Sequence, residues 1–539
     1  MTEINRIIKK HKFLFIFFAV YLLARVFLIN INYTEWGDTF RMIRGADYLS
    51  RLSWPWDEKR WPFYSLLLVP GIWLNAPVLW GRFLSLLASA WSLLLVYRFY
   101  LDYISNNIKY ALTAVIITAV SSVFAYWSLR VMADPVFTLL ILLFFFYSIR
   151  FYKEGGKDEA GSSQKVIILS FLLLCITMTR LEGLFAAAGI GVYLIFRKHL
   201  RDLMIFAIPQ IFIYVPWTVY AKFIYHWETT NNYFDEVQTF SFDSERLKYF
   251  LAYTLFILVL PVLTYYILIG LKSFLGNSKN KGLYLPLGVF IGLELIIGFV
   301  WIPSLPRIYL PLVPLFAMLA VYGIEKLNLN KINTPILLLN LFLLSTFTAL
   351  QYKYKLYFLG ASKIIFAVVI ISSFVSIFYV FWPVKFRKRI YLVSLVLFIN
   401  FLTSGIVIYN QHLVYKTVKQ GIDFVVDRRG IVAYSDETGN TEWYLKRRSI
   451  YMDSVKDFQI EDPDQQYRAL KNYGVSYLLW TNEFNRGFSA IDPESDSRYQ
   501  LLVEYKQTIN DPLDEVLGLF GVVKRENPQV FVTKVYEIR

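Results

Sequence analysis

The sequence is poor in charged residues, cysteine and histidine. Charged side chains make up 18% of its 539 residues, against about a quarter in a typical soluble domain. The single cysteine, Cys175, has no partner for an internal disulfide. The four histidines are scattered, so no histidine and cysteine cluster has the spacing of a zinc site. These absences argue against a disulfide-stabilised domain and a zinc enzyme. We predict no cofactor and leave a divalent metal open.

Long apolar runs take the place of these residues. Hydrophobic residues make up 56% of the chain, and its mean hydropathy is +0.45. Apolar runs of roughly 18 to 22 residues match the hydrocarbon core of a bilayer, which is about 30 Å thick. About thirteen candidate spans can be drawn: Phe13–Ile29, Val78–Tyr97, Ala111–Trp127, Pro135–Tyr147 (extended to Arg150), Val166–Met178, Leu184–Phe196, Met204–Tyr225, Phe250–Leu271, Leu283–Trp301, Ile308–Tyr322, Pro335–Leu350, Ile364–Phe381 and Tyr391–Tyr409. We therefore predict a mainly α-helical, polytopic membrane bundle.

Two apolar segments need separate interpretation. The first run, Phe13–Ile29, lacks a small-residue cleavage site, so we expect a first span and no cleaved signal. The segment Trp61–Leu74 is short and bounded by proline, which predicts a juxtamembrane or re-entrant helix.

The placement of basic residues predicts the orientation in the membrane. The net charge is +15, but lysine and arginine are spread among short loops, which argues against a nucleic-acid partner. With the N-terminus inside, the inner loops hold 22 lysines and arginines and the outer loops hold 13, as the positive-inside rule requires. An odd number of spans then places the C-terminus outside. We expect a plasma-membrane protein with a cytoplasmic N-terminus.

The composition changes after the last apolar run. We therefore predict a membrane domain over residues 1–410, with a long outer loop at 31–61, and an extracytoplasmic α/β domain over residues 411–539. Strand-like runs lie at Gly430–Tyr434, Val475–Trp480 and Val530–Ile538, and a helical stretch lies at Gln465–Tyr473. This domain has no glycine-rich phosphate loop, so we expect an accessory role for it.

Ionisable residues gather near the outer ends of the predicted spans. Such residues are costly in a membrane and are often functional. They are Asp38 in the outer loop, and Arg82, Arg130, Asp134, Arg180, Glu182, Glu294 and Arg307. Each has a structural alternative: a terminal arginine can extend to the headgroups, Arg180 and Glu182 can form an ion pair, and Glu294 can bond a neighbouring helix. Their common placement favours a functional site.

The order of these motifs resembles a known family. Asp38-Thr39-Phe40-Arg41 opens a helix to Leu49, and Trp61-Pro62-Phe63-Tyr64 follows. Further motifs are Arg82 in RFLSLL, Asp134 in RVMADPVF, Arg180-Leu181-Glu182-Gly183, and Pro306-Arg307-Ile308-Tyr309-Leu310-Pro311. Together they resemble the GT-C fold membrane glycosyltransferases, particularly the branch that holds protein O-mannosyltransferases and the lipid A aminoarabinose transferase. Thr39 and Trp61 depart from the branch pattern, and the Trp-Trp-Asp signature of oligosaccharyltransferases is absent.

The resemblance implies transfer of one sugar from a polyprenyl-phosphate carrier to a lipid, glycan or protein acceptor at the outer face. Asp38 would then be the general base. Arg180, Arg307 and Arg82 would hold the phosphate, and Asp134, Glu182 and Tyr64 would complete the substrate site. A base without a carboxylate nucleophile favours inversion.

Two other classes stay open. A transporter or lipid flippase places polar residues near the midplane, often on repeated halves, and no repeat is evident here. The second class is a membrane anchor whose outer C-terminal tail binds cell-wall polymers or partner proteins. In such a protein the long first loop would have no functional role.

Overall fold

The structure of the chain is a computed structural model. It describes residues 3–54, 58, 60–153, 162–220, 263–277, 281–300, 306–327, 333–354, 370–371, 374–375, 378, 389–435, 439–452, 455–458, 462–483, 493–509 and 529–539.

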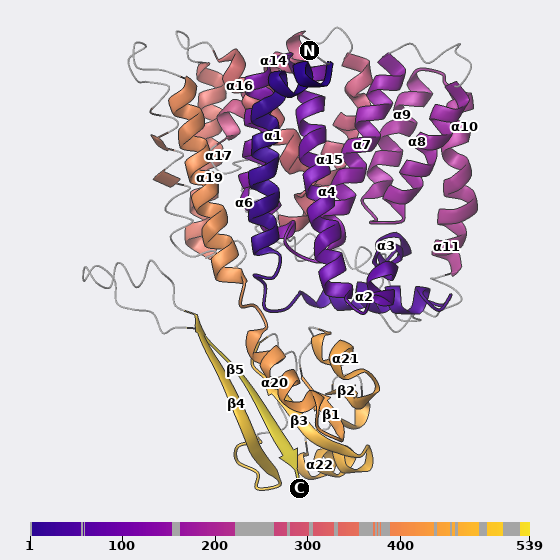
Figure 1. Cartoon of the computed structure of the whole chain (residues 1–539), viewed down its shortest axis with the longest axis vertical. Helices are drawn as coiled ribbons and strands as arrows, with labels where there is room; N and C mark the ends of the chain where they lie inside the picture. The colour runs from indigo at the N-terminus through magenta and orange to yellow at the C-terminus, as the bar shows by residue number, and fades with distance from the viewer. Residues whose placement is uncertain are drawn as a thin grey trace. The chain divides into compact units, whose positions relative to one another are not determined.

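The chain forms two compact units (Figure 1). The membrane unit takes in Met1–Ile29, Gly45–Ala361 and Ile365–Ile408, and the C-terminal unit contains Asn30–Arg44 and Tyr409–Arg539. The start of the loop predicted to lie outside therefore belongs to the same compact unit as the C-terminal domain.

The membrane unit is helical. Its described helices are α1 (Glu3–Leu28), α3 (Pro62–Trp73), α4 (Pro77–Phe99), α5 (Ile108–Val120), α6 (Ser122–Trp127), α7 (Ala133–Lys153), α8 (Ser162–Thr177), α9 (Gly183–Phe196), α10 (Leu200–Pro209), α11 (Val215–Val219), α14 (Thr264–Asn277), α15 (Leu285–Val300), α16 (Leu312–Lys326), α17 (Thr334–Tyr354) and α19 (Arg389–Gln411). Helix α2 (Gly37–Leu49) runs from the C-terminal unit into the membrane unit.

Several of these helices are suited to crossing a bilayer. Among the described residues, five are long and apolar enough to do so: His11–Leu28, Pro77–Ile104, Ala133–Lys153, Leu200–Val219 and Arg389–Tyr409. They confirm a polytopic, mainly helical membrane protein. The total of about thirteen spans stays a prediction, because part of Phe250–Leu271 and most of Ile364–Phe381 lie outside the described residues.

One predicted span is interrupted. The run Ala111–Trp127 was expected to be a single helix, but α5 ends at Val120 and α6 begins at Ser122. Between them Ser121 has an extended backbone, with ψ of 131°. Serine competes with helical hydrogen bonding through its own side chain, and two serines stand together at this point. The break ends the span early and leads the chain into a buried turn.

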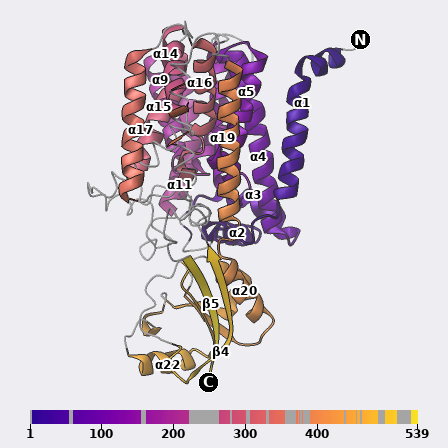
Figure 2. The ribbon, with the colours of Figure 1, turned by 90° about the vertical axis from the view of Figure 1, so that its left-hand side faces the viewer.

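Helices α14 and α16 pack through glycine. A Cβ atom at Gly270 would lie 1.9 Å from the carbonyl oxygen of Leu319, and one at Gly323 would lie 1.9 Å from that of Tyr266. Any side chain at either position would collide with backbone, and small residues allow this kind of close approach in membranes. Figure 2 shows the two helices side by side.

We expect Gly323→Ala to lower the melting temperature of the detergent-solubilised protein, because the two helices must move apart. Overpacking of this kind lowers the free energy of unfolding by about 1–3 kcal/mol. Gly288→Ala in α15 is the matched control, since no heavy atom lies within 4 Å of a Cβ there and alanine is the better helix former. A Gly323→Ala protein as stable as the control would contradict the packing described.

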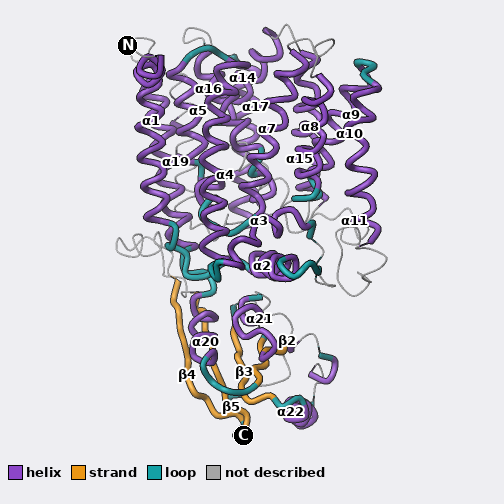
Figure 3. Tube along the Cα trace, turned by 45° about the vertical axis from the view of Figure 1, so that its right-hand side comes forward, coloured by secondary structure: helices purple, strands orange, loops and turns teal. Residues whose placement is uncertain are grey.

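The C-terminal unit contains a five-stranded sheet in the order β2-β1-β3-β5-β4. The strands are β1 (Ile431–Tyr434), β2 (Ser449–Tyr451), β3 (Val475–Thr481), β4 (Tyr499–Ile509) and β5 (Gln529–Ile538), and the helices are α20 (Lys416–Val426), α21 (Asn440–Leu445) and α22 (Pro463–Asn472). Strand β1 pairs in parallel with β2 and β3, whereas β5 pairs antiparallel with β3 and β4. All described strands lie in this unit (Figure 3). The predicted α/β domain is confirmed.

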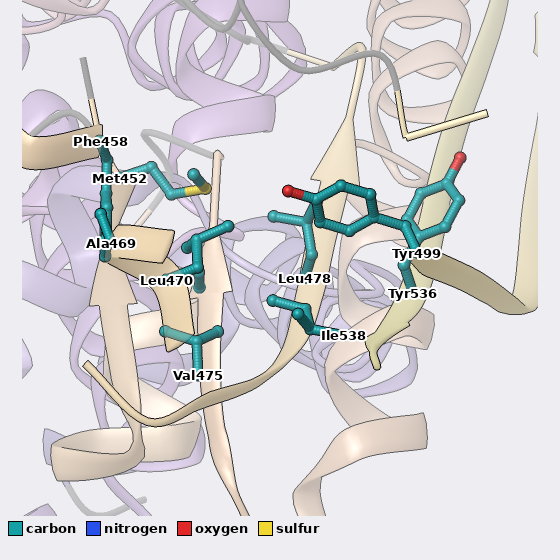
Figure 4. Packing of buried hydrophobic residues seen from close by; sticks show 10 residues of the cluster. Met452, Phe458, Ala469, Leu470, Val475, Leu478, Tyr499, Tyr536 and Ile538 are labelled. Atoms are coloured by element: carbon teal, nitrogen blue, oxygen red, sulfur yellow. The ribbon is translucent and has the colours of Figure 1, made fainter. Parts of the chain in front are cut away.

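Side chains alternate between the two faces of this sheet. Leu478 and Tyr536 pack with Leu470 of α22 on one face (Figure 4), whereas Leu479 packs with Ile422 of α20 on the other. Neighbouring residues of a strand point to opposite faces, so both faces bury apolar surface under a helix. The unit therefore has two hydrophobic cores of its own.

Candidate active site

A buried turn joins α6 to α7. From Trp127 to Asp134 no side chain is more than 8% exposed. Helix α4 holds the turn, since Ser85 Oγ donates to the carbonyl oxygen of Arg130 at 2.7 Å. A Cβ at Gly81 of α4 would lie 2.4 Å from a methyl group of Val131, so only glycine permits this approach. The turn places Asp134 at the start of α7 with 2% exposure.

A second tight turn brings an arginine to that carboxylate. Between α8 and α9, the backbone nitrogen of Gly183 donates to the carbonyl oxygen of Arg180 at 3.0 Å. The guanidinium of Arg180 donates from Nη1 to Asp134 and from Nη2 to Glu182. The side chains of Asp134, Glu182 and Arg180 are 2%, 9% and 17% exposed. Charge-assisted bonds to two carboxylates fix both the position and the plane of the guanidinium.

A third carboxyl group lies close to this ion pair. Glu294 of α15 is fully buried and interacts electrostatically with Arg180, Asp134 and Glu182. Neither of its carboxyl oxygens has a hydrogen-bond partner. Three acidic side chains thus interact with one arginine. Among the described residues, no set of three histidine, cysteine or acidic side chains has the geometry of a metal site.

A buried carboxyl group without a hydrogen bond costs roughly 1–3 kcal/mol. We therefore expect Glu294→Met to raise the melting temperature of the purified protein. Glu325→Met is the matched control, because Tyr100 Oη and Ser105 Oγ donate to that carboxylate at 2.8 and 2.7 Å. Its removal leaves two donors without an acceptor, so the melting temperature should fall. A lower melting temperature for Glu294→Met would show that its carboxyl group is stabilised in the fold.

The remaining predicted arginines lie around the buried turn. Arg307, in the 3₁₀ turn Pro306–Tyr309, donates to the sulfur of Met132 at 3.8 Å and lies 5.6 Å from the ring centre of Trp127. Arg130 is fully buried and lies over Tyr126. Arg307 thus contacts the same turn that carries Asp134.

Two other candidates lie on helices that pack together. Arg82 in α4 is 7% exposed, and Tyr64 in α3 is 1% exposed. Gly81, the neighbour of Arg82, meets both Leu68 of α3 and Val131 of the buried turn. The structure therefore brings Asp134, Arg180 and Glu182 into direct contact, and places the helix of Arg82 against the turn that leads to Asp134.

Asp38 lies in the C-terminal unit, whereas the other candidates lie in the membrane unit. It stands in the first turn of α2, where a carboxylate is favoured by the helix dipole. Of the two other aspartates in this loop, Asp47 is bound by Arg51 at 2.9 Å and Asp57 lies outside the described residues.

No sequence motif indicated which residues of the C-terminal domain contact this segment. Thr34 Oγ1 donates to Asn440 Oδ1 at 2.6 Å, and Arg44 Nη1 lies 2.7 Å from Glu442 Oε1. About 400 residues of sequence separate the members of each pair, so no local pattern could have revealed them.

The helical bundle followed by a small α/β domain has the GT-C fold of membrane glycosyltransferases, as the sequence motifs predicted. The fold matches the crystal structure of ArnT from Cupriavidus metallidurans bound to undecaprenyl phosphate, with a TM-score of 0.58, 11% identity, and coverage of 97% of this chain and 98% of that one. The apo state of the same protein gives a TM-score of 0.59 at 11% identity, with 98% of both chains covered.

An archaeal protein shares the fold more distantly. The oligosaccharyltransferase AglB from Archaeoglobus fulgidus, in complex with an inhibitory peptide and a dolichol-phosphate, matches with a TM-score of 0.51 and 11% identity over 92% of this chain and 73% of that one. No protein-family model and no curated protein sequence matches the chain. The likeness is therefore one of fold.

Proposed function

We propose that the chain is an integral membrane glycosyltransferase. It moves a single sugar from a polyprenyl-phosphate donor to an acceptor at the outer face of the membrane. The observation that carries this proposal is the guanidinium of Arg180, fixed between Asp134 and Glu182 in a nearly buried site. Two structures of the same fold contain lipid phosphates, undecaprenyl phosphate in ArnT and a dolichol-phosphate in AglB. Their presence supports a lipid-phosphate donor here.

The phosphate would be held by arginine. A guanidinium has five N–H donors, and the bonds to Asp134 and Glu182 use one on each terminal nitrogen of Arg180. Arg180 is also the most exposed member of the ion pair, so its other donors can meet phosphate oxygens. Arg307 and Arg82 complete the phosphate site in our proposal. Charge that develops on the leaving phosphate is stabilised strongly where water is scarce.

Asp38 is the proposed general base. An acceptor hydroxyl that attacks an anomeric carbon must lose its proton, and a positioned carboxylate can accept it. The phosphate leaves as an anion, so the reaction needs no acid on the leaving oxygen. A single displacement inverts the anomeric centre, by analogy with inverting glycosidases. The acceptor is a lipid, glycan or protein hydroxyl.

Asp38→Asn should abolish sugar transfer while the protein stays folded and binds donor. Asparagine keeps the size of the side chain and removes its capacity to accept a proton, and positioned acid–base catalysis contributes about 10²–10⁴-fold. The assay follows consumption of polyprenyl-phosphate sugars by purified protein in lipid. Asp47→Asn is the matched control: it removes only an exposed ion pair with Arg51, and it should retain most of the activity.

Two results would count against this assignment. Transfer by Asp38→Asn within a few-fold of wild type, with an inactive Asp134→Asn, would move the base to Asp134. Failure of the wild-type protein to consume any polyprenyl-phosphate sugar would overturn the proposed enzyme and favour a transporter.

A further inference from the structure

The segment that carries Asp38 is held by the C-terminal domain. The C-terminal unit includes Asn30–Arg44 as well as Tyr409–Arg539, so its internal contacts connect the two. The backbone nitrogen of Tyr33 donates to the carbonyl oxygen of His412 at 3.0 Å. The rings of Trp36 and Tyr415 meet edge to face with centres 5.6 Å apart. These contacts anchor the chain just before Asp38.

Helix α21 makes the contacts on the two sides of Asp38. On the N-terminal side, the hydrogen bond from Thr34 to Asn440 is buried, with these residues 3% and 0% exposed. On the C-terminal side, the ring of Phe40 lies 5.7 Å from that of Tyr444. One short helix therefore contacts the segment both before and after the carboxylate.

A side chain at Gly439 would be in van der Waals contact with the segment that carries Asp38. Gly439, the residue before α21, has φ of +68°, and a Cβ atom there would lie 3.5 Å from the carbonyl oxygen of Gly37. Gly37 is the residue next to Asp38. Farther along α2, the ion pair of Arg44 with Glu442 ties the helix to α21 a second time. We call this set of contacts, made by Asn440, Glu442 and Tyr444, the α21 clasp.

We propose that the α21 clasp positions Asp38 for catalysis, so that Asn440 and Glu442 of the C-terminal domain are positioning residues of the transfer reaction. This inference rests on the proposed function, in which Asp38 is the base. A misplacement of about 1 Å in a reacting group can cost roughly 100-fold in rate. The C-terminal domain then positions the proposed base, in place of the accessory role expected from its sequence.

The ion pair offers a test by charge exchange. Arg44 and Glu442 are 21% and 44% exposed, and ion pairs that are open to solvent contribute little to stability. Arg44→Glu and Glu442→Arg should therefore stay folded, yet each should lower kcat by about ten- to a hundred-fold, because like charges push α2 away from α21. KM for the donor should stay within a few-fold of wild type. The double variant, which carries both substitutions, restores the ion pair with its charges reversed and should recover most of kcat.

The buried hydrogen bond between Thr34 and Asn440 gives a second test. Asn440→Ala removes the buried hydrogen bond from Thr34, and kcat should fall with little change in the KM for the donor. Asp464→Arg is the control, because it breaks a more exposed ion pair, with Arg498, in the same unit. Asp464 lies on α22, at the opposite face of the sheet from α20. Its kcat should match that of wild type.

The outcomes separate the inference from the proposed function. If Asp38→Asn is inactive while Arg44→Glu, Glu442→Arg and Asn440→Ala turn over like wild type, the clasp has no positioning role and the glycosyltransferase proposal stands. If the double variant fails to recover activity, or Asp464→Arg loses as much kcat as Glu442→Arg, the effect is general destabilisation and the inference is overturned. If the wild-type protein transfers no sugar, the proposed function itself fails.

Discussion

The membrane unit depends on the ion pair that Arg180 makes with Asp134 and Glu182. It connects the turn between α6 and α7 to the turn between α8 and α9. A charged group in the interior is tolerated only when it is paired and hydrogen-bonded, so these turns must meet with their charges aligned. The early end of α5 at Val120 and the fully buried turn that follows place Asp134 at that meeting point. The break between α5 and α6 thus shortens the span and allows the chain to reach the polar site.

The two units divide the proposed chemistry between them. The membrane unit holds the arginines proposed for the donor phosphate, and the C-terminal unit holds Asp38 together with the helix that contacts its segment.

Much of the fold follows from the sequence. Runs such as Val78–Tyr97 correspond closely to α4, and the ion pair of Arg180 with Glu182, considered as a structural alternative, is present because two residues in a turn are near each other by connectivity. Strand β4 was missed, because Tyr499–Ile509 has no clean polar alternation and is stabilised by pairing with β5. The pairing of Arg180 with Asp134 and of Arg44 with Glu442 depends on tertiary packing. Helical periodicity carries no information about such distant partners.

The affinity of the purified protein for undecaprenyl phosphate, compared between wild type and Arg180→Lys, tests the account most directly. A lysine offers a compact point charge and cannot bond both carboxylates and a phosphate in one plane. Loss of one or two charge-assisted bonds, each about 1.5–3 kcal/mol, predicts a dissociation constant raised at least about tenfold. Arg51→Lys, which changes an exposed residue paired with Asp47, should bind like wild type. Equal affinity of Arg180→Lys and wild type would contradict a donor phosphate site built on Arg180.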